Sequence, residues 1–220
     1  MENDDLILKN IIQVIDNQYF GCVSYYNSLF WYSNTKIERC DNFQKMSFRN
    51  RCTIAGSNGL VNLTIPVVGG RNKKQLMQDV KIDQTQAWQL QHFKTILSCY
   101  GKSPFFEFYR DDVEKLLKCQ DIFLFDFNFK ILIWLKKILQ LPGEIEVTNN
   151  FIVSYDSSDI IDNRNKWLPK NFQQADSHSI IYQQVFEGRI GFQKNLSILD
   201  LLFCEGPNAK NLLKSNRNLF

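Results

Sequence analysis

Two arginines flank one asparagine in the stretch MSFRNRC, which runs directly into the small-residue loop AGSNG. A guanidinium presents a planar set of donors that matches a carboxylate or a phosphate bidentately, and an amide adds a donor and an acceptor. In a strand, Arg49 and Arg51 would lie on the same face, with Asn50 on the opposite one. The pattern predicts an anion-binding clamp. The alternative is an exposed strand edge that pairs with Glu38 or Asp41.

His92 is the candidate for acid or base catalysis. It lies four residues after Trp88 and four before Ile96, beside the apolar stripe of an expected helix. That position suits a group acting at the edge of a cleft, and the alternative is a core histidine bonded to internal partners. The other histidine, His178, lies in a polar stretch and is expected at the surface. Neither histidine has a second ligand at a diagnostic spacing, so no metal site is predicted.

Polar residues also interrupt two apolar segments. Asp126 and Asn128 fall inside IFLFDFNFKILIWLKKIL, where they are either inward-facing substrate-binding residues or the polar rim of an amphipathic helix. Asp200 stands inside SILDLLF, and a carboxylate between apolar neighbours normally needs a partner, for which one of the arginines is a candidate. Cys52 and Cys99 have no adjacent histidine and are expected to be packing residues.

Composition and charge exclude several classes of protein. The 220 residues are 44% hydrophobic and 22% charged, and the net charge of +3 is spread along the chain, so no nucleic-acid partner is expected. Six cysteines without a CxxC pair indicate reduced thiols in a cytoplasmic protein. The acidic start MENDDLILKN does not resemble an export signal. Charged residues within the most apolar segment, residues 122–139, argue against a membrane span.

The fingerprints GxxxxGK[ST], GxGxxG, GxSxG and HExxH are absent from the sequence, which argues against a P-loop enzyme, a dinucleotide-binding fold of the usual kind, an α/β-hydrolase and a zincin. The sequence identifies no cofactor and leaves the oligomeric state open.

The elements that must position these residues alternate in type. We expect strands over residues 20–26, 35–40, 59–67, 144–153 and 179–186, and helices over residues 27–34, 86–100, 111–118, 121–140 and 195–203. The polar stretch from 157 to 177 is expected to be a loop. Strands at both chain ends with a central helical segment predict a single three-layer α/β domain over residues 1–220, in which the central helices form one face or a lid.

With these pieces in order, the chain resembles the WbqC-like family, bacterial proteins often linked to cell-surface polysaccharide genes. The resemblance covers nearly the whole chain and rests on NFQKMSFRNRC with IAGSNG, LTIPV with GGR, DVKID, QHFKTILSCYGKSPFFEFYRDD, YQQVF and GFQKNLSILDLLFCEGP. It favours Lys45 and Lys94 as further contacts of an anion, against the alternative that both are solvated. Two features depart from the family pattern: FGCVSYY lacks the usual proline, and Phe93 replaces the usual tryptophan.

The resemblance implies a cytoplasmic enzyme that modifies a sugar or another envelope precursor. Our leading hypothesis is a transferase-like enzyme that binds an anionic small molecule, a nucleotide sugar or an acyl donor, through Arg49, Asn50 and Arg51, with His92 as acid or base. The alternative is a non-catalytic binding or scaffolding protein of an envelope-biosynthesis complex, with the surplus of aromatic residues forming a partner surface. Convergence of the arginines and His92 on one polar cleft would favour the enzyme.

Overall fold

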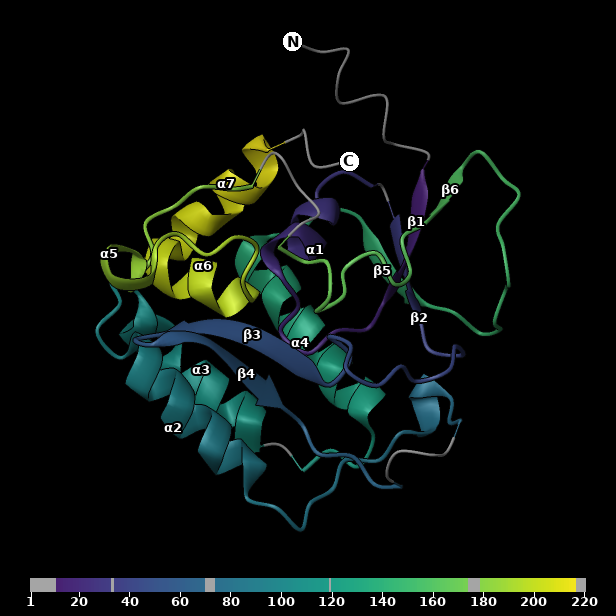
Figure 1. Cartoon of the computed structure of the whole chain (residues 1–220). Helices are drawn as coiled ribbons and strands as arrows, with labels where there is room; N and C mark the ends of the chain where they lie inside the picture. Colours follow the sequence, from purple (N-terminus) through teal and green to yellow (C-terminus); the bar gives the residue numbers. More distant parts are fainter. Residues whose placement is uncertain (1–10, 33, 70–73, 119, 174–178, 217–220) are drawn as a thin grey trace.

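A computed structural model describes residues 11–32, 34–69, 74–118, 120–173 and 179–216. The chain is mixed α/β, as predicted, with a four-stranded sheet, a separate two-stranded hairpin and helices between and after them (Figure 1). One cluster of buried apolar residues extends from Ile15 to Leu213 and connects these parts. Among the described residues, none of the helices is long and apolar enough to cross a membrane.

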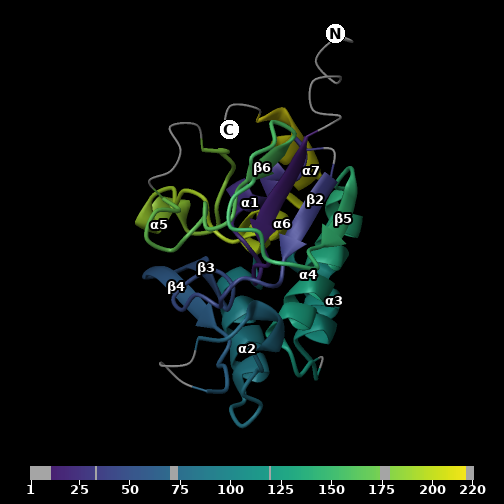
Figure 2. The same ribbon diagram turned by 90° about the vertical axis from the view of Figure 1, so that its right-hand side faces the viewer.

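The larger sheet has the strand order β5-β2-β1-β6, and all its pairings are parallel. Its strands are β1 (Ile12–Asp16), β2 (Asn34–Glu38), β5 (Glu144–Val147) and β6 (Ile160–Asp162). β1 is central and almost wholly buried, and even its Gln13 lies in the interior, where its side chain donates to Thr35 Oγ1 at 3.0 Å. Figure 2 shows the four strands side by side, above the hairpin and α2.

The opening of the chain has the expected strand, helix and strand, but at shifted positions. The first strand is β1, and residues 20–26, which were predicted to be that strand, instead lead into helix α1 (Val23–Ser28). The helix is buried along its whole length, so burial on every side hides the 3.6-residue period that would have identified it. The apolar run was therefore misassigned by type, whereas β2 lies within a residue or two of its predicted place.

The second sheet is an antiparallel hairpin of β3 (Arg51–Gly56) and β4 (Gly59–Thr64). Gly59 follows the turn with φ +127, a conformation that side chains rarely adopt, so glycine is required there. The register pairs Arg51 with Thr64 and Thr53 with Asn62. Side chains two residues apart on each strand therefore share one face of the hairpin.

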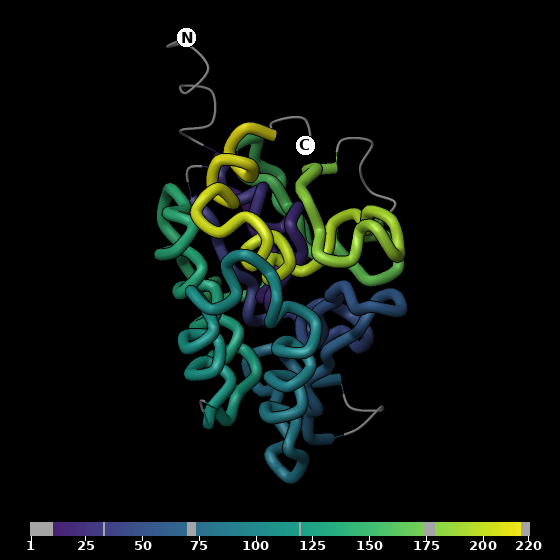
Figure 3. Tube along the Cα trace, turned by 90° about the vertical axis from the view of Figure 1, so that its left-hand side faces the viewer, coloured from purple at the N-terminus to yellow at the C-terminus, as the bar shows by residue number. Residues whose placement is uncertain are grey.

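The central helical segment is confirmed as α2 (Trp88–Tyr100), α3 (Phe106–Lys118) and α4 (Leu124–Leu139). Three short helices and a 3-10 turn follow near the C-terminus: α5 (Glu187–Ile190), α6 (Ile198–Glu205), η3 (Gly206–Asn208) and α7 (Ala209–Ser215). The connection between α2 and α3 lies beside α6, where the Phe105 N–H donates to the Phe203 carbonyl at 3.0 Å (Figure 3).

The strand expected over residues 179–186 does not form. Ile180, Tyr182 and Gln184 are buried while Ile181 and Val185 are exposed, so the alternation that predicted a strand is real. No strand of the described chain pairs with this segment, and it is held instead by side-chain bonds such as Gln184 to the Gln193 backbone at 2.8 Å. The sixth strand, β6, comes from the stretch predicted to be a loop.

Three parallel strands end in an acidic residue: β1 in Asp16, β2 in Glu38 and β6 in Asp162. Because the carboxyl ends of parallel strands meet at one edge, these carboxylates lie in neighbouring positions of the sheet. Ligands of open parallel sheets bind most often beyond this edge. The residues that follow these strands therefore define the region in which a functional site is sought.

Candidate functional site

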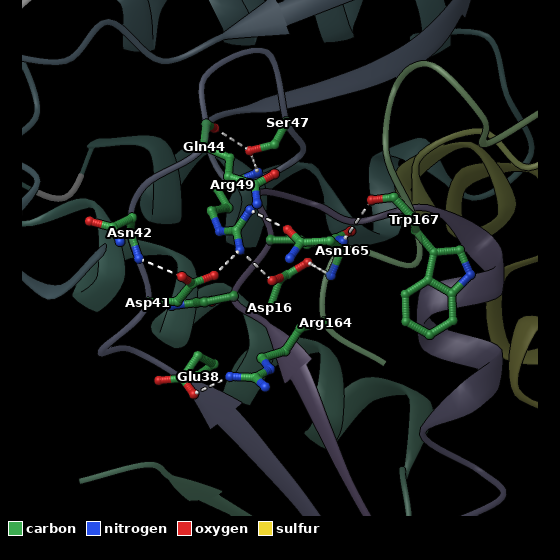
Figure 4. A network of polar contacts seen from close by, with 12 residues as sticks. Asp16, Glu38, Asp41, Asn42, Gln44, Ser47, Arg49, Arg164, Asn165 and Trp167 are labelled. Atoms are coloured by element: carbon green, nitrogen blue, oxygen red, sulfur yellow. Dashed lines mark hydrogen bonds and ion pairs between the residues drawn. The ribbon is translucent and has the colours of Figure 1, made fainter. Parts of the chain in front are cut away.

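Arg49 is buried at the carboxyl edge of the sheet, with 2% of its surface exposed. Its Nη2 donates to Asp16 Oδ1 at 2.5 Å and to Asp41 Oδ2 at 3.2 Å, and its Nη1 donates to Asn165 Oδ1 at 3.1 Å (Figure 4). Asp16 Oδ2 in turn accepts the Asn165 backbone N–H at 2.8 Å. Burial raises the pKa of Asp16, and the neighbouring Arg49 guanidinium opposes that shift. The guanidinium thus bonds three internal partners, Asp41 among them.

The expected arrangement of Arg49 and Arg51 on one strand face is wrong, because β3 begins only at Arg51. Asn50 closes the open end of the hairpin: its Nδ2 donates to the Ile65 carbonyl and its own carbonyl accepts the Ile65 N–H, both at 2.8 Å. Arg51 behaves differently from its two neighbours. It is partly exposed, and its buried Nε has no hydrogen-bond partner within the described part of the chain.

Arg51 lines a cleft of about 590 Å³, a volume typical of small-molecule sites. One wall is the segment 44–51, another is the face of the β3–β4 hairpin, and the third is the segment 168–172. We call this the anion cleft after the three basic side chains in its lining, Lys45, Arg51 and Lys170. Its first side is called the 44–51 wall and its third side the 168–172 wall. The lining residues are Gln44, Lys45, Met46, Ser47, Arg51, Thr53, Leu60, Asn62, Leu168, Pro169, Lys170 and Phe172.

The hairpin supplies the polar floor of the anion cleft. Thr53 lies two residues after Arg51 on the same face, and its hydroxyl donates to Asn62 Oδ1 at 2.8 Å across the register. On the 44–51 wall, the Ser47 hydroxyl donates to the Gln44 carbonyl at 2.6 Å. Met46 on the same wall has φ +55, a left-handed conformation that is uncommon for a side chain of its size.

His92 lies in the interior and does not line the anion cleft. Its Nδ1 is 2.9 Å from the Tyr19 hydroxyl, with which it shares a hydrogen bond, and the backbone of Thr64 also bonds the ring. The Trp88 ring packs edge-on against it, with the centroids 5.3 Å apart. Burial lowers the pKa of His92 to about 4, so the imidazole is neutral at neutral pH. These internal contacts are those of a core histidine, which was the alternative interpretation of His92.

The other sequence candidates separate into surface and interior positions. Lys45 is exposed and lines the anion cleft, whereas Lys94 is exposed on α2 and lines a different hollow. Asp126 is exposed in the first turn of α4. Asn128 is fully buried, and its Nδ2 donates to the Arg49 carbonyl at 2.7 Å. His178 lies outside the described residues. Of these candidates, the structure brings only Lys45 and Arg51 together at one cavity.

Asp200 is bonded by tyrosines and not by an arginine, the candidate partner that the sequence offered. Its two oxygens accept the Tyr100 hydroxyl at 2.6 Å and the Tyr182 hydroxyl at 2.8 Å. The side chain is wholly buried, and desolvation raises the pKa of Asp200 to about 6, although both hydroxyls oppose the shift. Two hydroxyl donors satisfy the carboxylate in place of a cation. Asp200 therefore has a structural place, as the sequence suggested, with different partners.

A second charged group lies at the same sheet edge. Arg164 donates to Glu38 Oε2 at 3.3 Å (Figure 4). It also donates to Asp162 Oδ2 at 2.5 Å. Its guanidinium carbon also lies 5.0 Å from the Phe151 ring centroid and 5.3 Å from that of Tyr155, in cation–π contacts. Arg164 thereby connects the loop between β5 and β6 to the carboxyl edge of the sheet.

Sequence reasoning missed four residues of this region: Asp16, Arg164, Asn165 and Lys170. The available signal was a carboxylate at the end of an apolar strand-like run, in IIQVID and again in DIID. Among the described residues, no group of three or more His, Cys, Asp or Glu side chains is placed to hold a metal ion.

A model of the WbqC-like protein family matches residues 17–169, which is more than half of the 220-residue chain. The chain belongs to the WbqC-like protein family. The match includes the 44–51 wall, the hairpin, α2 and Asn165, and it ends just before Lys170, so the motifs over residues 182–207 lie beyond it. No curated protein matches the chain, and no solved structure does.

Proposed function

We propose that this WbqC-like protein binds an anionic small molecule in the anion cleft, through Arg51, Lys45 and Lys170. The charge of the cleft carries the proposal, since three basic side chains line it and no acidic one does within the described chain. Arg51 is partly exposed at the cleft, so its guanidinium is accessible to a bound anion.

The cleft offers complementary contacts to an anion that carries a larger uncharged group. Arginine binds the oxygens of phosphate or carboxylate in a bidentate fork, and the two lysines supply mobile point charges. Ser47, Thr53 and Asn62 add hydroxyl and amide groups for a sugar or a similar polar moiety. Leu168 and Phe172 supply apolar surface for a base or an acyl chain. A nucleotide sugar or an acyl donor combines these features.

A transferase-like role in the modification of polysaccharide or envelope precursors follows from the link between WbqC-like proteins and cell-surface polysaccharide genes. A cytoplasmic location accords with the six thiols and with activated precursors as ligands. The internal bonds of His92 and Arg49 make them unsuited to touch such a ligand. The proposal therefore assigns the anion contacts to Arg51, Lys45 and Lys170.

Isothermal titration calorimetry with uridine and thymidine diphosphate sugars and with acyl-phosphopantetheine compounds tests the proposal. Arg51→Gln should weaken binding of the preferred ligand by at least tenfold, because a charge-assisted bidentate contact is worth about 1.5–3 kcal/mol. Lys102→Gln is the matched control, since it removes one exposed positive charge outside the cleft. Equal affinities of wild type and Arg51→Gln would refute the assignment.

One observation supports the alternative of a non-catalytic binding protein. Three consecutive apolar residues of the β5–β6 loop, Phe151, Ile152 and Val153, have 45%, 45% and 82% of their surface exposed. Such a run is typical of protein-binding surfaces when it is rimmed by polar residues. If the chain binds none of the tested donors, and Val153→Asp abolishes its association with a biosynthetic enzyme, this second function is the correct one.

A further inference from the structure

The geometry points to Arg49 and Asn165 as a pair of positioning residues that hold the 168–172 wall against the 44–51 wall and so set the width of the anion cleft. This inference rests on the proposed function and adds how the site is kept in its binding geometry. Neither residue lines the cleft. Both act through the chain segments to which they belong.

The Arg49 guanidinium joins three segments that are far apart in the sequence. Asp16 ends β1, Asp41 follows β2 and Asn165 follows β6, and one side chain bonds all three at 2.5, 3.2 and 3.1 Å (Figure 4). In the chain, Arg49 lies between two cleft residues, Ser47 and Arg51. The bond to Asn165 therefore connects the 44–51 wall directly to the segment that leads into the other wall.

The segment after Asn165 is built as one unit. The Leu168 N–H donates to Asn171 Oδ1 at 2.9 Å, and Asn171 Nδ2 donates to the Lys166 carbonyl at 3.1 Å. Residues 166–171 are thus tied to one another, and the chain enters them at Asn165, which has φ +58. The buried Trp167 and the bond from Asn195 Nδ2 to the Phe172 carbonyl, at 2.8 Å, also hold this segment. The ring of Phe172 packs edge-on against Phe48, with the centroids 5.4 Å apart, at the far end. Asn165 is thus the point at which the Arg49 guanidinium bonds the chain that leads into this wall.

The position of this wall decides whether the basic groups act together. Lys170 belongs to the 168–172 wall, while Lys45 and Arg51 belong to the other side of the cleft. An anion held from both sides needs oxygens within hydrogen-bond reach, about 3 Å, of each group. A shift of about 1 Å in the wall weakens the contact although no charge has changed. Affinity should therefore depend on Asn165, which does not touch the ligand.

Asn165→Gly separates this role from general stability. Glycine keeps the positive φ and the backbone N–H that donates to Asp16, and it deletes the carboxamide whose Oδ1 accepts from Arg49. The substitution changes no charge. Thr148→Val is the matched control, because it deletes a buried hydroxyl at the same sheet edge, outside the cleft walls. This hydroxyl donates to Glu38 Oε1 at 2.7 Å and accepts the Arg39 N–H at 3.2 Å.

Two readouts are needed, hydrogen exchange of the amides in residues 166–172 and calorimetric titration with inorganic pyrophosphate. We expect Asn165→Gly to accelerate exchange in this segment by about tenfold, as loss of one hydrogen bond to a charged group implies, and to weaken pyrophosphate binding at least fivefold. Thr148→Val should leave both unchanged at a similar melting temperature. Equal losses in the two variants would overturn the positioning role.

The failures of the two proposals are distinguishable. If wild type binds pyrophosphate, and Asn165→Gly binds it equally well with unchanged exchange in residues 166–172, the positioning role is wrong and the proposed function stands. If wild type binds neither pyrophosphate nor a nucleotide sugar while exchange in residues 166–172 still rises in the variant, the link between the walls is supported and the proposed function is wrong.

Discussion

Replacing Arg49 by methionine tests whether its guanidinium is an internal ion-pair partner or a ligand clamp. The side chain is 2% exposed, and its Nη2 lies 2.5 Å from Asp16 Oδ1 and 3.2 Å from Asp41 Oδ2. Methionine occupies much of the same space but leaves the buried Asp16 carboxylate without its cation. Removing one partner of a buried pair costs about 3–5 kcal/mol, so the free energy of unfolding should fall by that amount.

Arg49→Met should also change the pH dependence of stability. Burial already raises the pKa of Asp16, and the variant loses the guanidinium that opposes this shift. The folded variant then binds a proton more readily than the unfolded chain does. Its deficit relative to wild type should therefore shrink as the pH falls from 8 towards 5, because a carboxyl group whose pKa is raised on folding stabilises the folded state at low pH. Adding Asp16→Asn should recover part of the loss at pH 8.

Urea unfolding followed by tryptophan fluorescence and circular dichroism, at several pH values, measures these effects. The linear extrapolation gives the free energy of unfolding for wild type, Arg49→Met and the double variant. The reasoning would be refuted if Arg49→Met lost less than about 1 kcal/mol, the size of an exposed ion pair, while its affinity for pyrophosphate disappeared. The guanidinium would then be the ligand clamp that the sequence suggested.

The remaining predictions concern the two titrating interior groups and one glycine. The pKa of Asp200 is raised to about 6, so the difference in unfolding free energy between wild type and Asp200→Asn should fall by about 3 kcal/mol as the pH rises from 4 to 8. The pKa of His92 is lowered to about 4. The difference in unfolding free energy between wild type and His92→Gln should therefore have the opposite pH dependence, and fall by about 3 kcal/mol as the pH drops from 7 to 4. Both are measured by denaturant titration, and a pH-independent difference would contradict either. Gly206→Ala should lower the free energy of unfolding by about 2–5 kcal/mol, because φ is +54 and the new Cβ would lie 2.4 Å from the Phe105 ring. The control Gly188→Ala, whose Cβ would have nothing within 4 Å, should change the melting temperature little. Equal shifts of the melting temperature in the two variants would contradict this account.

Much of the fold could be predicted because local patterns agreed with the tertiary structure. The central helices carry a clear apolar stripe and were placed within a few residues, and the β3–β4 region was identified in part from its β-branched residues. Misassignments occurred where burial surrounds an element, as in α1, or where alternation occurs without a pairing strand, as in residues 179–186. Periodicity reports which side of a segment is buried, and it does not report what the backbone bonds to.

The site could be predicted only in part. The arginine pattern points to the region of the proposed site, since Arg51 and Lys45 line the anion cleft. It did not distinguish Arg51 from Arg49, which is buried and forms ion pairs with Asp16 and Asp41. That distinction depends on where β1 ends and on the register of the sheet, which are properties of long-range pairing. Lys170 lines the cleft from a segment more than a hundred residues after Arg51 in the chain. No local sequence pattern predicts a contact over such a distance.

The most direct test of the anion cleft is the NMR signal of the Arg51 Nε–H, which the structure leaves without a hydrogen-bond partner among the described residues. The signal can be assigned by its loss in Arg51→Lys. Titration of pyrophosphate, and then of the preferred nucleotide sugar, should shift this resonance in a saturable way, with an equal concentration of chloride as the control. A resonance that stays in place while other signals of the protein report binding would show that the anion binds elsewhere.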